Sequence, residues 1–360
     1  MRVLIDATSV LLRSAGIKSY TYHWIRHLRA LAGGDTIHAF PLLGDLGGLR
    51  HERSVLSAAS TYPRLALLHL VNIAGSRGID RMASGFDLVH LSNQVRVAPS
   101  KVRMTATVHD LTCWLLPALH TAANVRADRS FAEHAWKKAS GLIAVSENSR
   151  EDAIRLLGIA PEKIQVIYSG VSEEYFDAKP SASKRPYVLF VGTIEPRKNV
   201  DTLLDAWHLL RADVRAEFDL VIAGATGWSS ARTVCRLNSG IEGIRYLGYV
   251  REAELPGLTA GATAFAYPSL YEGFGFPVAQ AMACGVPVVT SNNSCLPEIA
   301  GEGAIYVDAR SAVETAGALE RVLASSGLRG RLAEAGKKRA QRYRWEECAR
   351  QSLDFFHRIP

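Results

Sequence analysis

Residues 269–285 constrain the fold most strongly, because they join two apolar runs through a loop with two glycines and a short helix. The runs at residues 262–267 and 286–291 are typical of buried strands in a parallel sheet. Gly273 and Gly275 let the backbone turn or approach a ligand, and a Phe-Pro pair then opens the helix. Because the first amides of a helix are unpaired, they favour a phosphate group. The pattern predicts a strand-loop-helix-strand unit, either with or without a bound anion.

The full string of this stretch, S-L-Y-E-G-F-G-F-P-V-A-Q-A-M-A-C-G, resembles the E-x7-E segment of the retaining glycosyltransferases of family four, which have the GT-B fold. In that family the first Glu contacts the donor sugar and the second holds the nucleotide ribose. Glu272 matches the first position, and Gln280 occupies the second, so the segment here is E-x7-Q. The resemblance implies that the loop between them also binds the donor, through Gly273, Phe274, Gly275 and Phe276.

The composition is that of a globular protein with two domains. Its 360 residues exceed one typical core, and contents of 48% hydrophobic and 21% charged residues are those of a soluble protein. We find no apolar run of about 18 residues that would predict a transmembrane helix, and the first residues lack the apolar core of a signal peptide. Five scattered cysteines without a C-x-x-C pair favour a reducing cytoplasm over a disulfide framework or a metal cluster.

The net charge of +7 and the pI of about 9.2 favour anionic partners. The sequence has neither zinc-finger spacing nor a basic-aromatic recognition strand, so we expect no nucleic-acid binding. A nucleotide-sugar pocket and a membrane face are the expected uses of the charge. Residues 62–83 predict a basic amphipathic helix, which either packs on the core or lies on a membrane surface. Its apolar positions are Leu65, Leu68, Val71 and Ile73.

Strands alternate with helices in both halves of the chain, which predicts two Rossmann-like, doubly wound α/β domains. A polar, proline-containing stretch at residues 171–186 predicts the linker. Residues 1–170 then form the N-terminal acceptor domain, and residues 187–344 form the C-terminal donor domain. The resemblance implies that the two domains face each other across a cleft with the active site. It also implies that a terminal helix at residues 345–360 packs back onto the first domain.

Two candidate site residues follow strands of the first domain, and ligands gather at the carboxyl ends of parallel strands. The first strand, residues 2–7, leads into Ser14-Ala15-Gly16, which is either an ordinary turn or a loop whose amide faces the cleft. The family has a Gly-rich loop here that approaches the donor phosphate, which implies this role for Gly16. The strand at residues 102–108 ends in His109-Asp110. The family's matching His borders the donor sugar, whereas a lone His is more often structural.

Two adjacent cations, Arg197 and Lys198, follow the first strand of the second domain and precede a helix. They are either a solvated pair or a phosphate site. The string around them resembles the family's E-P-x-K-N segment, whose cations bind the donor diphosphate. Lys198 matches that lysine, and Thr193 stands where many members have Arg, so Arg197 is the expected second cation. The resemblance places Thr193 itself among the residues that contact the donor. Further along, L-G-Y-V resembles the segment that reads the nucleotide base, which implies that Val250 contacts the base.

The resemblance implies sugar transfer from a nucleotide donor with retention of the anomeric configuration. Lys198, Arg197 and the amides of the glycine loop would stabilise the leaving nucleoside diphosphate, so we expect neither a metal nor a cofactor. Glu272 would hold sugar hydroxyls from one domain, and His109 would contact the sugar from the other. Because no residue stands out as a covalent nucleophile, we favour front-face transfer.

Two other functions are alternatives. One is a nucleotide-sugar epimerase of the same fold. The other is a catalytically silent nucleotide-sugar binding protein, which is an alternative because Gln280 replaces the second Glu of the family's segment. The string from Thr193 to Asn199 favours GDP-mannose as the donor, with UDP-sugars next. The acceptor would be a lipid-linked glycan, a polysaccharide or a small molecule. We expect the protein in the cytoplasm, either free or peripheral on the cytoplasmic face of a membrane.

Overall fold

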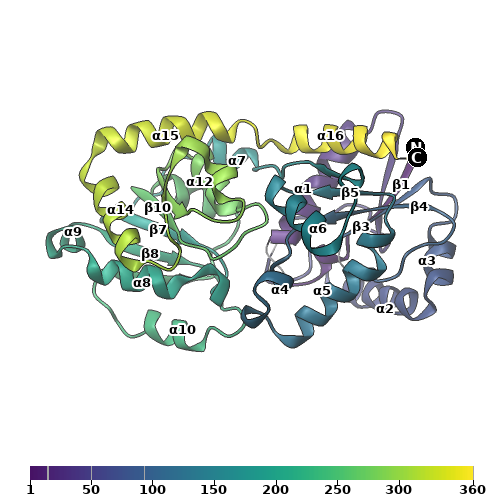
Figure 1. The fold of residues 1–360 in the computed structure, drawn as a ribbon, viewed down its shortest axis with the longest axis horizontal. Helices are drawn as coiled ribbons and strands as arrows, with labels where there is room; N and C mark the ends of the chain where they lie inside the picture. Colours follow the sequence, from purple (N-terminus) through teal and green to yellow (C-terminus); the bar gives the residue numbers. More distant parts are fainter. Residues whose placement is uncertain (14–15, 50, 93, 360) are drawn as a thin grey trace. The chain divides into compact units, whose positions relative to one another are not determined.

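The computed structural model describes residues 1–13, 16–49, 51–92 and 94–359. Ser14 and Ala15 of the predicted loop, and the last residue of the predicted terminal helix, therefore lie outside the described residues. The chain divides into two compact units, Met1–Gly170 with Arg344–Pro360, and Val171–Tyr343. Each unit contains a six-stranded parallel sheet covered by helices (Figure 1). The predicted α/β class with two Rossmann-like domains is confirmed.

The sheet of the N-terminal unit has the strand order β2-β1-β3-β4-β5-β6, with all neighbours parallel. The strand order reverses between β1 and β3, and ligands of such sheets bind beyond the carboxyl ends at this point. The inner strands β3, β4 and β5 are almost fully buried, as expected of a sheet covered on both faces. They are β1 (Arg2–Asp6), β2 (Thr36–Phe40), β3 (Leu88–Leu91), β4 (Arg103–Val108), β5 (Gly141–Ala144) and β6 (Ile164–Val166).

The C-terminal helix belongs to the N-terminal unit and runs beside its first helix (Figure 1). The indole Nε1 of Trp24 donates a hydrogen bond of 2.9 Å to Ser352 across this contact. Trp345 packs edge-on against Tyr20 in the same contact. The α-helices of this unit are α1 (Gly16–Leu31), α2 (Ala58–Ala74), α3 (Ser76–Met82), α4 (Thr112–Leu115), α5 (Ala122–His134), α6 (Glu147–Leu157) and α16 (Trp345–Arg358).

The single helix predicted at residues 62–83 is wrong, because Gly75 separates α2 from α3. Gly75 has φ of 64°, in the left-handed region that interrupts a helix. The predicted apolar face also differs from the observed one. Val71 is buried, but Ile73 is 69% exposed, because two residues of a helix correspond to about 200° of rotation.

The sheet of the C-terminal unit has the strand order β12-β11-β10-β7-β8-β9, also with parallel neighbours. Here β7 and β10 are neighbours although 72 residues lie between the end of β7 at Val191 and the start of β10 at Ala264. The loops that follow these two strands therefore meet at one edge of the sheet. The strands are β7 (Tyr187–Val191), β8 (Asp219–Ala223), β9 (Ile244–Gly248), β10 (Ala264–Tyr267), β11 (Val288–Ser291) and β12 (Ala304–Val307).

Helices cover this second sheet, and residues 171–186, predicted as the linker, are part of the same unit. No helix in the described ranges is long and apolar enough to cross a membrane. The α-helices of the unit are α7 (Glu173–Phe176), α8 (Val200–Leu209), α9 (Ala212–Glu217), α10 (Ala231–Leu237), α11 (Leu255–Ala260), α12 (Phe276–Ala283), α13 (Leu296–Ala300), α14 (Ala312–Ala324) and α15 (Ser326–Ala340).

We expect the N-terminal unit to lose stability in mild acid because of His90. Its ring is fully buried between the hydroxyls of Thr105 and Thr107, each 2.9 Å away. Burial, assisted by His109, lowers the pKa of His90 from 6.5 to about 3. The unfolded chain takes up a proton below pH 6.5 and the folded chain does not, so stability falls as the pH decreases from 6.5 toward 3.

A histidine of this kind lowers the free energy of unfolding by about 1.4 kcal/mol for each pH unit below 6.5, or by about 2 kcal/mol between pH 6.5 and 5. Urea unfolding at pH 7.5 and pH 5 measures this difference in the native protein and in His90→Gln, which keeps a donor and an acceptor. The variant should show a pH dependence smaller by about 2 kcal/mol. An equal pH dependence in both proteins would remove His90 as its source.

Candidate active site

The candidate site lies at the carboxyl ends of β7 and β10 in the C-terminal unit. After β7 the chain forms a 3-10 turn, Pro196–Lys198, and Asn199 then enters the left-handed region at φ 58°. The Asn199 carboxamide donates to the backbone oxygens of Pro268 (2.9 Å) and Ala309 (2.6 Å). The amide of Leu270 donates to the oxygen of Arg197 at 2.9 Å. These bonds join the loop after β7 to the loop after β10 and so bring the two sequence motifs together.

The side chains of Arg197, Lys198 and Glu272 form one buried ionic cluster in these loops. Lys198 Nζ lies 2.6 Å from Glu272 Oε1, and Arg197 NH1 lies 2.9 Å from Glu272 Oε2. The other nitrogen of the guanidinium, NH2, lies 2.8 Å from Glu195 Oε1. Both carboxylates and both cations are nearly buried, and each cation has a carboxylate partner. Such a cluster is an electrostatically balanced site in which each charge depends on the others.

Two hydroxyl groups complete the shell of Glu272. The phenol of Tyr267 donates to Oε1 at 3.0 Å and accepts a bond of 2.8 Å from Lys198 Nζ. Ser269 donates to the same oxygen at 2.7 Å. The backbone amide of Glu272 donates to Ser294 Oγ at 3.0 Å. The sequence analysis assigned no role to Glu195, and it did not select these hydroxyls, although Tyr267 and Ser269 flank the central motif.

The cations keep Glu272 ionised in spite of its burial. Burial opposes ionisation, but Arg197 and Lys198 outweigh it and lower the pKa of Glu272 to about 2. The pKa of Lys198 is lowered by burial and by the neighbouring Arg197, with Glu272 acting against both. Burial raises the pKa of Glu195. A diphosphate that enters this cluster would meet two poorly hydrated cations, and it would compete with Glu272 for them.

The loop from Gly273 to Phe276 leads from this cluster into α12. Gly275 is the N-cap of α12 and has φ of 78°, which a residue with a side chain rarely adopts. The ring of Phe274 is buried edge-on against Phe276 (5.1 Å) and Tyr343 (5.4 Å), so it supports the loop from inside. The helix N-terminus therefore begins beside Glu272, where its first amides and positive dipole end favour an anion.

The other predicted donor contacts lie on neighbouring loops of the same unit. Thr193 follows β7 in a segment held by two bonds, Ile194 N to Ala225 O and Gly227 N to Ile194 O. Val250 follows the end of β9 and is half-buried. Gln280 lies in the second turn of α12 with its side chain half-exposed. All three belong to the unit that holds the ionic cluster.

His109 and Gly16 belong to the N-terminal unit, where His109 follows β4 and Gly16 begins α1. The Nε2 atom of His109 is buried without a hydrogen-bond partner, and the ring packs edge-on against Tyr20 at 4.8 Å. Burial lowers the pKa of His109 to about 4, although the Asp110 carboxylate acts in the opposite direction. The ring is therefore neutral at physiological pH, and its buried Nε2 has no hydrogen-bond partner among the described residues. Gly16 is the first residue of α1, in open space.

Asp6, which the sequence analysis did not select, organises the carboxyl edge of the N-terminal sheet. Its buried carboxylate accepts hydrogen bonds from Thr8 at the end of β1 and from the amides of Gln94 and Val95 beyond β3. These bonds join the two strands at which the strand order reverses. The sequence could have pointed to Asp6, because it is an acidic residue at the end of the predicted first strand.

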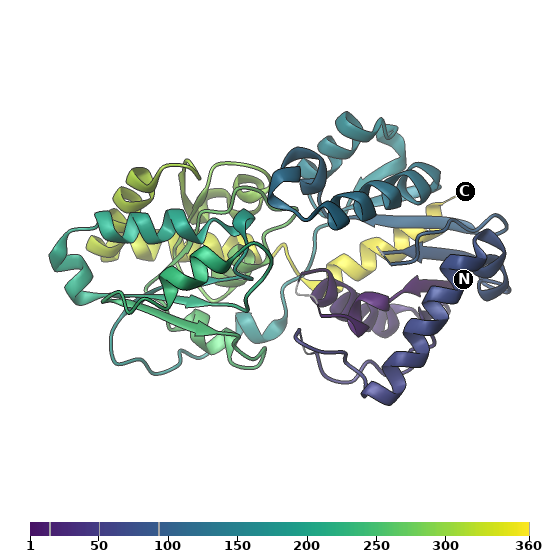
Figure 2. The ribbon, with the colours of Figure 1, turned by 90° about the horizontal axis from the view of Figure 1, so that it is seen from below.

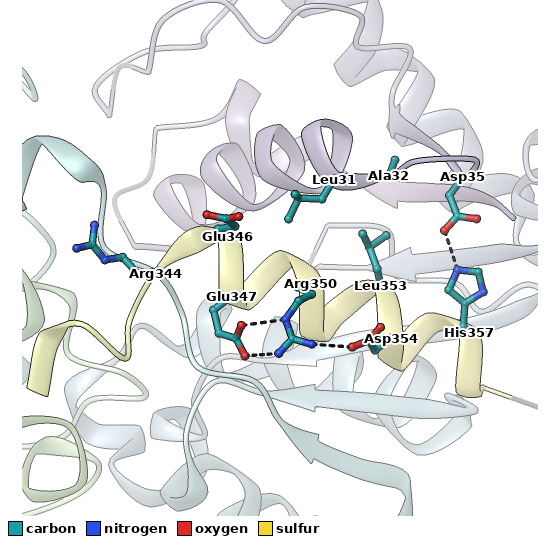
Figure 3. Close-up of a pocket in the computed structure, with 10 residues that line it drawn as sticks. All are labelled: Leu31, Ala32, Asp35, Arg344, Glu346, Glu347, Arg350, Leu353, Asp354 and His357. Atoms are coloured by element: carbon teal, nitrogen blue, oxygen red, sulfur yellow. Dashed lines mark hydrogen bonds and ion pairs between the residues drawn. The ribbon is translucent and has the colours of Figure 1, made fainter.

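A hollow of about 530 Å³ between α1 and α16 is a different feature (Figure 3). Five of its charged or titratable side chains are paired: Arg350 binds Glu347 and Asp354, and His357 binds Asp35 at 2.7 Å. Asp35 precedes β2, so this end of the hollow lies at the amino edge of the sheet, away from the edge that binds ligands in such folds. We therefore place no site there.

Two family models match the chain and together cover nearly all of it. The model described as "Glycosyl transferases group 1" matches residues 171–339, and the model described as "Glycosyltransferase Family 4" matches residues 14–175. O-antigen chain mannosyltransferase B of Escherichia coli is 33% identical over 266 residues, which are 71% of this chain and 70% of that protein.

Solved structures with the same fold are more distant in sequence. Sucrose-phosphate synthase from Thermosynechococcus elongatus has a TM-score of 0.74 at 19% identity and covers 99% of this chain and 98% of that one. HepE from Anabaena, in complex with UDP-glucose, has a TM-score of 0.72 at 18% identity and covers 99% of both chains. At these identities the likeness establishes the fold alone.

Proposed function

The chain belongs to the group 1, family 4 glycosyltransferases and has their GT-B fold, and from this premise we propose that it is a retaining mannosyltransferase. The donor would be GDP-mannose, and the acceptor would be a hydroxyl group of a growing polysaccharide or glycolipid. The observation that carries the proposal is the buried pair of cations, Arg197 and Lys198, beside Glu272 and the N-terminus of α12.

The choice of mannose is supported by the similarity to O-antigen chain mannosyltransferase B, which shares 33% of the aligned residues. GDP as the nucleotide rests on the resemblance of the segment from Thr193 to Asn199 to members that use GDP-mannose. UDP-sugars stay the second choice, because the fold is shared with a protein that binds UDP-glucose.

In the proposed reaction, the acceptor oxygen forms a bond to the anomeric carbon while the bond from that carbon to the phosphate oxygen breaks. GDP leaves with the bonding electrons, and one of its phosphate oxygens takes the proton of the acceptor hydroxyl. Arg197, Lys198 and the first amides of α12 stabilise the charge that develops on the diphosphate. Glu272, freed from part of its cation pairing, accepts hydrogen bonds from the sugar hydroxyls. His109 contacts the sugar through its unpartnered Nε2.

Sugar transfer should survive removal of divalent metal ions, because two side-chain cations and helix amides provide the positive charge. The measurement is the rate of transfer before and after treatment with EDTA. We expect the two rates to agree. Loss of activity with EDTA and its recovery with Mg²⁺ or Mn²⁺ would contradict this expectation.

Gln280→Glu should bind GDP at least as tightly as the native protein and stay active. A carboxylate accepts bonds from both ribose hydroxyls, whereas the amide accepts through one oxygen and donates through its nitrogen. The expected gain is about 1 kcal/mol, the usual difference between charged and neutral hydrogen bonds. Calorimetric titration of GDP into both proteins measures it. Clearly weaker binding to the variant would mean that the site is adapted to the amide, and the ribose assignment would fail.

A two-step experiment tests the function. Thermal unfolding is first measured with GDP, GDP-mannose, UDP and UDP-glucose, since a ligand at 100 times its Kd stabilises the folded protein by about 2.7 kcal/mol. We expect the guanine nucleotides to stabilise the protein most. NMR then follows GDP-mannose with candidate acceptors, and we expect an α-mannoside and GDP. A β-mannoside would contradict retention. An epimerised donor without acceptor, or binding without turnover, would instead favour the epimerase or the silent binding protein.

We also propose that the protein works in the cytoplasm, at the face of a membrane where lipid-linked acceptors are elongated. The five cysteines are free, and three of them are buried, which is compatible with a reducing compartment.

A further inference from the structure

We infer that α2, with the adjoining α3, is a docking surface for an anionic lipid bilayer. Eight large hydrophobic side chains are exposed in the part of the chain that the structure describes, and three of these belong to α2. They are Tyr62 (71% exposed), Leu70 (62%) and Ile73 (69%). We call Tyr62, Leu70 and Ile73 the apolar patch.

The apolar patch lies on one face of α2. At 100° per residue, Tyr62, Leu70 and Ile73 fall within an arc of about 80°. The opposite face, which carries Val71, packs on the unit. Figures 1 and 2 show α2 and α3 along the outside of the N-terminal unit. The helix therefore has an apolar face toward its core and a second apolar face toward the solvent, which a partner has to cover.

The charges next to the apolar patch fit an anionic partner. Helix α2 has no Asp or Glu. Helix α3 continues with Arg77 and Arg81, both exposed, and its one acid, Asp80, is occupied by hydrogen bonds from Ser100 and the amide of Lys101. An exposed apolar face bordered by cations is typical of helices that lie in the interface of anionic membranes.

A second copy of this chain fits the surface less well. In a two-fold symmetric dimer both copies use the same surface, so the contact would bring Arg77 and Arg81 of both copies to one interface. Like charges in a contact repel each other, and the helix offers no acid to balance them. A lipid headgroup surface supplies the opposite charge, and its acyl region accepts Leu70, Ile73 and the ring of Tyr62.

The position of α2 also relates the surface to the ligand-binding edge of its sheet. Asn72 Nδ2 donates to the oxygen of Gln94 at 3.2 Å, and Asn72 Oδ1 accepts from the amide of Arg96 at 2.9 Å. The same segment is held by Asp6 at the end of β1. A bilayer bound at α2 would therefore lie close to the carboxyl edge of the N-terminal sheet, within reach of an acceptor anchored in the same bilayer.

The test is sedimentation of the full chain with vesicles of phosphatidylcholine, with and without an equal part of phosphatidylglycerol. We expect binding to the anionic vesicles and little binding to the neutral ones. Leu70→Ser/Ile73→Ser should weaken binding about tenfold or more, because it removes most of the inserted apolar area. Arg77→Gln/Arg81→Gln should weaken it about tenfold or more and reduce its salt dependence. Because all four side chains are exposed, the unfolding temperature should not change.

Val313→Ser is the matched control, since Val313 is 72% exposed on α14 of the other unit, and this variant should bind vesicles like the native protein. Equal binding by the native protein and both double variants would overturn the inference, as would absence of binding to the anionic vesicles. Dimerisation that Leu70→Ser/Ile73→Ser abolishes, without vesicle binding, would assign the face to a second copy instead. Because vesicle binding needs neither donor nor acceptor, its failure would leave the proposed sugar transfer untouched.

Discussion

Replacement of Lys198 by alanine should lower the rate of sugar transfer by about two to three orders of magnitude. Lys198 is one of two cations aimed at the leaving diphosphate, and loss of one stabiliser of transition-state charge costs about 2.7–4 kcal/mol. The variant also leaves the buried Glu272 with one cation fewer, so the pKa of Glu272 should rise from its value of about 2. The loss should appear mainly in kcat, because the charge on the phosphate grows as the bond to the sugar breaks.

The measurement is kcat and KM for the donor in the native protein and in three variants, the first of which is Lys198→Ala. Lys198→Arg keeps the charge and should retain part of the activity. Lys137→Ala is the matched control, because Lys137 forms an exposed ion pair with Glu133 on the surface, and it should behave like the native protein. Near-normal turnover by a folded Lys198→Ala protein would exclude Lys198 from the site.

Gly224→Ala should destabilise the C-terminal unit by about 3 kcal/mol or more, at the upper end of what overpacking usually costs. A Cβ atom at Gly224 would lie 1.8 Å from the backbone oxygen of Gly192, so the ends of β7 and β8 would have to separate. The amide of Gly224 also donates to Gly248 O at 2.7 Å, which prevents the chain from moving away. Because Gly192 leads directly to the cation-bearing turn, nucleotide binding should weaken as well.

Urea unfolding of Gly224→Ala and of Gly330→Ala measures the effect. Gly330 lies inside α15 with open space around it, so this control should be stabilised by about 0.5–1 kcal/mol, the usual gain from replacing a helical Gly by Ala. Stability of Gly224→Ala within 1 kcal/mol of the native protein would contradict the predicted contact.

Most of the fold could be predicted because its strands are short apolar runs between turn residues. The strand at Tyr187–Val191 is an example. It is a continuous apolar run between Pro186 and Gly192, which is the pattern expected of a buried parallel strand between two turns. Helix boundaries were harder. Leu65, Leu68 and Val71 repeat every three residues, which fits a helix, but the repeat did not show that Gly75 interrupts it.

The members of the site differ in how far the sequence could reveal them. Lys198 and Glu272 belong to strings that resemble a family, so both could be selected without knowing that they touch. Their contact depends on β7 and β10 being neighbours, which is a property of the strand order. The bond from Tyr267 to Glu272 lies between the end of β10 and the loop that follows it, and it could not be predicted either, since an aromatic residue at a strand end usually belongs to the core. The outward face of α2 was missed because periodicity identifies an apolar face without showing what covers it.

A crystal structure of the protein with GDP tests the central claim most directly. The account predicts that the diphosphate lies within hydrogen-bond distance of Arg197 and Lys198 and of the first amides of α12. It also predicts that Glu272 has lost at least one of its two cation contacts. GDP bound elsewhere on the chain, with the cluster of Arg197, Lys198 and Glu272 unchanged, would contradict the account.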